Sequence, residues 1–151
     1  MEQLLSMIAL WLSVNFGLPA HGLLPRIEFH DRAAITQLWA EHISRKQDMT
    51  PRALKVETSE LRIQAFYDDR EQIIFLREDW NPTSQKDLSI LVHEMVHHLQ
   101  KLDKRTFNCP AERERLAYKA QDAWLGLFQT SLENEFEIDP FTRLVSTKCM
   151  H

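Results

Sequence analysis

The segment His93-Glu94-Met95-Val96-His97 has the residue types and spacing of a metal-binding helix. Four residues along an α-helix advance a side chain by about 40° beyond one full turn, so His93 and His97 lie one above the other. Two neutral imidazoles at this spacing can bind one zinc ion. Glu94 leaves the helix beside them, where its carboxylate can accept a proton from a water molecule that the ion activates. The motif predicts metal-assisted hydrolysis with Glu94 as the general base.

The apolar residues of the same segment place the two histidines away from the core. They form one stripe, made of Leu88, Leu91, Val92, Met95, Leu99 and Leu102. At about 100° per residue, both histidines point nearly opposite to the centre of this stripe. The alternative to a metal site is therefore a pair of histidines on a solvated helix face.

A catalytic zinc ion usually takes three protein ligands, so the motif requires one more. Glu112 and Glu114 follow His97 by about 15 residues, in the first turns of the next predicted helix. A carboxylate at position 112 is already explained by helix capping and by the helix dipole. Glu114 has no such explanation and is the preferred third ligand, with Glu112 as the alternative.

HExxH followed on a second helix by Glu-x-x-Ala-Tyr resembles the gluzincin metallopeptidases, in particular small single-domain members. Glu114, Ala117 and Tyr118 match this second motif. The resemblance covers roughly residues 60–128. It implies a minimal zincin core, in which a small β-sheet packs on the HExxH helix and the following Glu-bearing helix. Residues 91–100 and 117–125 are also similar to uncharacterised bacterial proteins.

The resemblance implies a zinc-dependent peptidase that acts on a peptide or protein substrate. An edge strand would hold the extended peptide by main-chain hydrogen bonds, and residues 73–77 would be that strand. Tyr118, His98 and Tyr67 are candidates for stabilising the oxyanion. Tyr118 is equally explained by packing or by orienting a ligand, a role that also suits Gln121. His98 points about 100° away from His97, so it is expected to be buried or to orient a ligand.

The periodicity of apolar residues predicts the elements that must position this site. An alternating strand at residues 26–29 precedes a helix capped by Asp31, and a polar loop covers residues 45–51. Period-two patterns around residues 61–67 and 73–76, with a turn at 68–71, predict a hairpin. The order helix, strand, helix, hairpin, helix, helix predicts an α+β fold.

Residues typical of helix N-termini mark the starts of the two helices that carry the candidate ligands. Ser84 with Asp87 three residues later fits a capping box for a helix that ends near residue 102. Pro110 suits the first position of a second helix, which is expected to reach residue 128. The stretch 133–151 is expected to be an extended tail.

Composition narrows the remaining classes of function. The chain has 151 residues with 18 Lys and Arg against 22 Asp and Glu, a formal net charge of −4. This length fits a single domain over residues 1–151. The absence of a basic excess argues against nucleic acid as a partner, and the three glycines form no phosphate-binding pattern.

The N-terminal segment allows two interpretations. Residues 1–20 fit an amphipathic helix that packs on the domain, whereas their apolar run also resembles a signal sequence that lacks the positive n-region. A transmembrane span is not expected. Cys109 and Cys149 are either two buried thiols or one disulfide. The cytoplasm is therefore slightly favoured, and the periplasm or secretion is the alternative if the segment is a signal and the cysteines pair.

Two rival functions remain open at this level. The first is the zinc metallopeptidase, with His93, His97 and Glu114 as ligands. The second is a non-catalytic module, in which the metal only stabilises the fold and the exposed strand binds a peptide. The presence of Glu94 favours the first, because a module without turnover has no need of a general base. Iron or manganese also suits histidine and carboxylate ligands.

Overall fold

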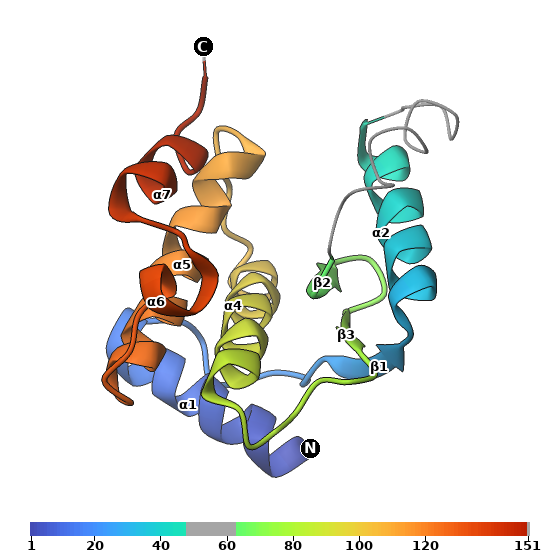
Figure 1. The fold of residues 1–151 in the computed structure, drawn as a ribbon. Coiled ribbons are helices and arrows are strands. Elements are labelled where there is room, and N and C mark those ends of the chain that lie inside the picture. The colour runs from blue at the N-terminus through green and yellow to red at the C-terminus, as the bar shows by residue number, and fades with distance from the viewer. Residues whose placement is uncertain (48–62, 151) are drawn as a thin grey trace. The chain divides into compact units, whose positions relative to one another are not determined.

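The computed structural model describes residues 1–47 and 63–150 (Figure 1). The described elements are six helices and one three-stranded mixed sheet, which confirms the α+β prediction. Contacts along the chain define two units. One consists of residues 1–24 together with the chain from Asn81 onward, and the other is Pro25–Trp80.

The sheet of the Pro25–Trp80 unit has the strand order β1-β3-β2. Strand β1 (Arg26–His30) runs parallel to β3 (Ile73–Arg77), and β2 (Ala65–Asp68) pairs with β3 in antiparallel register. The predicted hairpin is therefore confirmed. The assignment of residues 73–77 as an edge strand is wrong, because β3 is hydrogen-bonded on both sides. Among the described strands, β1 and β2 form the edges.

Helix α2 (Arg32–Gln47) packs on this sheet through an apolar cluster. Its buried members are Ile35, Phe66, Ile73 and Phe75. Asp31 caps the helix as predicted, with its carboxylate accepting from the Ala34 N–H at 2.8 Å. The helix continues to Gln47, so part of the loop predicted at 45–51 is helical; residues 48–51 and 61–62 lie outside the described residues.

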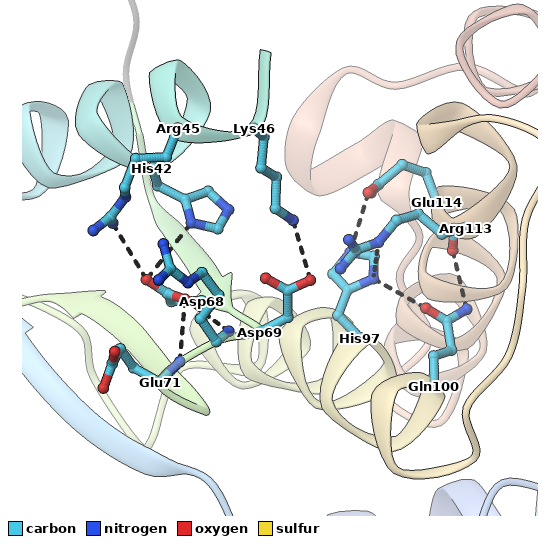
Figure 2. A network of polar contacts seen from close by, with 11 residues as sticks. His42, Arg45, Lys46, Asp68, Asp69, Glu71, His97, Gln100, Arg113 and Glu114 are labelled. Carbon is cyan, nitrogen blue, oxygen red and sulfur yellow. Dashed lines mark hydrogen bonds and ion pairs between the residues drawn. The ribbon is translucent and has the colours of Figure 1, made fainter. Parts of the chain in front are cut away.

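Asp68 ties the hairpin turn to α2. Its Oδ1 accepts from the N–H of Arg70 at 2.9 Å, and its Oδ2 lies 3.6 Å from His42 Nδ1 and 3.5 Å from Arg45 Nη2 (Figure 2). Burial lowers the pKa of His42, assisted by the charge of Lys46 and opposed by that of Asp68. The buried polar pair of His42 and Asp68 is therefore explained by its role in holding the hairpin turn against α2.

In the other unit, α1 (Glu2–Phe16) packs against α4 (Gln85–Leu102). The buried residues of α1 are Leu5, Ile8, Ala9 and Leu12. The helix ends at Gly17, whose φ of 67° is the left-handed conformation of a helix C-cap. The structure thus has the N-terminal helix that the periodicity predicted. None of the described helices is long and apolar enough to cross a membrane.

Helix α4 begins where the sequence predicted. Ser84 Oγ accepts from the Asp87 N–H at 3.2 Å. The reciprocal half of the capping box differs, because the Asp87 carboxylate accepts from the Asn81 N–H at 2.9 Å and Ser84 N–H donates to the Asn81 carbonyl. The Asp87 carboxylate therefore stabilises the turn that precedes the helix, through Asn81.

The chain after α5 (Pro110–Gly126) forms α6 (Leu132–Phe136) and α7 (Pro140–Ser146), so the extended tail predicted at 133–151 is wrong. Ser131 and Asp139 cap these helices with their side-chain oxygens. An apolar period is hard to recognise over five and seven residues, which explains the error. Cys109 and Cys149 form a disulfide with a Cα–Cα distance of 5.8 Å, which joins the start of α5 to the segment after α7.

Candidate metal centre

Helices α4 and α5 bring the three predicted ligands together. The predicted orientation holds in part: α5 covers the face of α4 that carries His93 and His97, so both histidines are buried. Glu114 reaches them from α5 and is about one-third exposed. Each of the three residues offers a ligand atom, and these atoms all lie within 4.8 Å of one another. The group could hold one metal ion.

The Glu114 carboxylate faces both imidazoles. Its Oε2 lies 3.0 Å from His93 Nε2. Its Oε1 lies 3.2 Å from His97 Nε2, a contact that Figure 2 shows. Glu112 lies elsewhere, because its Oε2 accepts from the Asn108 N–H at 2.7 Å before the helix. The geometry therefore favours Glu114 over Glu112 as the third ligand, and Glu112 has the capping role that its position suggested.

Each imidazole has a glutamine amide oxygen at its other nitrogen. Gln121 Oε1 lies 3.0 Å from His93 Nδ1, and Gln100 Oε1 lies 3.2 Å from His97 Nδ1. Both glutamines are buried. Partners of this kind commonly fix the orientation and the tautomer of a metal-binding histidine.

Further hydrogen bonds determine which way each amide points. Gln100 Nε2 donates to the Arg113 carbonyl at 3.1 Å, and Gln121 Nε2 donates to Ser89 Oγ at 3.2 Å. In this orientation both amide oxygens face the rings, so each Nδ1 donates its proton to an amide oxygen. Arg113 Nε also lies 3.4 Å from His97 Nδ1. In this tautomer both of those atoms are donors, so His97 Nδ1 hydrogen-bonds to Gln100 and not to Arg113.

The electrostatics of the site follow from this tautomer. Two Nε2 lone pairs face a carboxylate, so a proton or a metal cation must lie between these acceptors. Burial lowers the pKa of His93, but the hydrogen bond and the charge of Glu114, together with the charge of Glu94, outweigh it and raise the pKa. For Glu114, burial raises the pKa, whereas the hydrogen bonds to His93 and His97 hold it far below its ordinary value.

The remaining predicted residues separate into two groups. Glu94 is buried on α4, and the Tyr118 ring packs edge-on against the His93 ring at 4.8 Å between centroids. Burial, with the charges of Glu114 and Glu94, raises the pKa of Tyr118. His98 is fully buried and turns away, with Nε2 donating to the Leu23 carbonyl at 2.8 Å. Tyr67 belongs to β2 of the other unit.

Sequence reasoning missed Gln100 and Ser89. Gln100 follows His97 by three residues, so it stands on the same helix face, one turn further along α4. Ser89 precedes His93 by four residues in the same way. A search of the i±3 and i±4 positions around the histidines would have found both, although residue type alone does not distinguish them from solvated polar residues.

Comparison with known proteins adds a family but no activity. Neither a search of curated proteins nor a search of solved structures found a significant match. The family model described as "Domain of unknown function (DUF6647)" matches residues 1–150. This match extends over both units and includes every residue of the candidate metal centre. The chain therefore belongs to the DUF6647 family.

Proposed function

We propose that the protein is a zinc-dependent metallopeptidase. The observation that carries the proposal is the convergence of His93 Nε2, His97 Nε2 and the Glu114 carboxylate on one point, with the buried Glu94 beside them. The resemblance of both motifs to the gluzincins supports the peptidase class over other hydrolases.

The donor set fits zinc. Two imidazole nitrogens and one carboxylate are a common catalytic ligand set for this ion, which keeps a further position for water or substrate. When bound, zinc polarises a carbonyl group and lowers the pKa of water toward neutrality. The same donors also suit iron or manganese, so metal analysis has to compare these ions.

The side chains around the ligands supply the proton transfers of hydrolysis. Glu94 takes the proton of the attacking water and delivers it to the leaving amine, so no covalent intermediate on the chain is required. Tyr118 lies beside His93, and its raised pKa keeps the phenol protonated. A protonated phenol can donate a hydrogen bond to the oxyanion of the tetrahedral intermediate.

The disulfide supports an oxidising compartment as the place of action. Disulfides persist in secreted and periplasmic proteins and are rare in the cytosol. Cys109 and Cys149 are paired, and no free cysteine is present among the described residues. Of the compartments that the sequence left open, this pairing favours the periplasm or the extracellular space over the cytoplasm. The substrate would then be a peptide or protein met outside the cytosol.

Glu94→Gln tests the function, because glutamine keeps the size of the side chain but cannot accept the proton. We expect the variant to keep its zinc and to lose peptide hydrolysis by about 10²- to 10⁴-fold. The assay is cleavage of an unstructured peptide mixture by zinc-loaded protein, read by mass spectrometry, with Glu112→Gln as the matched control. Hydrolysis that survives in Glu94→Gln would reject the general base. Zinc-loaded wild type without hydrolysis would favour the peptide-binding module.

A further inference from the structure

We propose that Gln121 and Gln100 are positioning residues that hold the two imidazoles ready for the metal, and that only Gln121 could be exchanged for a carboxylate. The proposal rests on the metal centre of the proposed function but does not depend on hydrolysis. It concerns how tightly the protein holds the ion.

The two glutamines connect the ligands of α4 to α5. Gln121 reaches from α5 to His93, and its amide nitrogen returns to Ser89 on α4. Gln100 reaches from α4 to His97, and its amide nitrogen donates to the Arg113 carbonyl, directly before Glu114. We call each of these chains, from a histidine ring through a glutamine amide to the other helix, a relay. Each relay fixes the orientation of one histidine ring and the separation of the two helices that carry the ligands.

The anchors of the two amides differ in chemistry. Ser89 has a hydroxyl group, which accepts from Gln121 and itself donates to the Lys86 carbonyl at 2.7 Å. This hydroxyl can rotate and donate to a carboxylate at position 121 instead. The Arg113 carbonyl can only accept, so a carboxylate at position 100 would place two oxygens against each other in a buried site.

The neutral character of both relays has a consequence for metal affinity. A carboxylate that accepts from Nδ1–H makes the imidazole a more basic ligand and strengthens its bond to the metal. An amide oxygen orients the ring without this added charge. The wild-type centre therefore holds the ion less tightly, and leaves it more electrophilic, than a carboxylate relay would.

The test is the dissociation constant of Zn²⁺ itself, measured by competition with a chromogenic chelator at fixed pH. We expect Gln121→Ala to bind Zn²⁺ about 10- to 100-fold more weakly than wild type and Gln121→Glu to bind it about tenfold more tightly. We expect Gln100→Glu to bind more weakly. Gln3→Glu on the exposed face of α1 adds the same charge outside the relay and is the control for net charge.

The sign of the Gln121→Glu effect separates a relay from a packing role. A residue that only fills space would weaken binding when exchanged for a buried carboxylate, whereas a relay strengthens it. Adding Ser89→Ala to Gln121→Glu removes the donor, and we expect the gain in affinity to disappear.

Zn²⁺ affinities of Gln121→Ala and Gln121→Glu within twofold of wild type would overturn the proposal. Should Gln121→Glu fail to fold, which circular dichroism would show, the Zn²⁺ affinities of Gln121→Ala and Gln100→Ala are the test. Wild-type affinity in both variants overturns the proposal, and weaker binding in both supports it. Absence of hydrolysis in zinc-loaded wild type and in every variant would count against the peptidase and leave the order of Zn²⁺ affinities as the test of this proposal. A wild type that binds no Zn²⁺ would remove both proposals.

Discussion

The Glu114 carboxylate lies opposite the ring nitrogen of His93 that carries no proton in the assigned tautomer, with 3.0 Å between Oε2 and Nε2. Gln121 holds the proton on the other nitrogen, Nδ1. In the metal-free protein, a second proton on His93 can satisfy this contact, and in the loaded protein a cation can replace it. Protonation and metal binding therefore compete for the same place.

This competition predicts how the stability of metal-free protein changes with pH. The pKa of His93 is raised above its ordinary value of 6.5 in the folded state. Its contribution to the free energy of unfolding is thus complete below pH 6.5 and is lost as the pH rises through the raised pKa. We expect the urea midpoint in the presence of a chelator to fall above pH 6.5 in wild type, and to fall less in Glu114→Gln.

Other titrating groups act in different pH ranges. The pKa values of His42 and His98 are lowered by burial, so their contributions are lost as the pH falls below 6.5. The pKa of Glu114 is lowered in the folded state, so its contribution is lost only as the pH falls below the ordinary pKa of 4.5. Parallel profiles for wild type and Glu114→Gln above pH 6.5 would show that the His93–Glu114 pair does not control this range.

Tyr118→Phe removes one hydroxyl group and keeps the ring that packs on His93. We expect kcat for peptide hydrolysis to fall by about 10²-fold with little change in KM, because the phenol donates only to the developing oxyanion. Zinc content should stay at the wild-type value. Unchanged kcat would assign Tyr118 to packing alone.

The disulfide constrains the unfolded chain. Cys109 and Cys149 are separated by 40 residues, and a loop of this size contributes about 4 kcal/mol in the loop-entropy model. We expect the Cys109→Ser, Cys149→Ser double variant to unfold at a clearly lower urea concentration than wild type. The measurement is equilibrium unfolding of both proteins without reductant. A double variant as stable as wild type would mean that the bridge adds no net stability.

Most of the metal centre could be predicted from sequence because its residues lie on two long helices. Helical spacing alone places His93 above His97, and the capping position of Glu112 leaves Glu114 for the site. The glutamines were harder to predict. The sequence offers Gln121 only as an alternative to Tyr118 and does not distinguish Gln100, because the roles of both depend on contacts between α4 and α5 that spacing within one helix does not fix.

The sheet shows a second limit. The pattern of residues 73–77 predicts a strand, and its pairing with β2 follows from the short turn between them. The parallel partner β1 precedes β3 by more than forty residues, so no local signal fixes which side of the hairpin it joins. The peptide-binding strand expected from the resemblance is therefore not β3, which is the central strand, whereas β1 and β2 are the outer ones of the described strands.

Zinc content is the most direct test of the central claim that His93, His97 and Glu114 form one metal centre. Wild type, Glu114→Ala and Glu112→Ala are purified with added Zn²⁺, dialysed and analysed by inductively coupled plasma mass spectrometry. We predict about one zinc per chain in wild type and Glu112→Ala, and loss of most of it in Glu114→Ala. Equal zinc in wild type and Glu114→Ala, with Glu112→Ala depleted, would contradict this assignment.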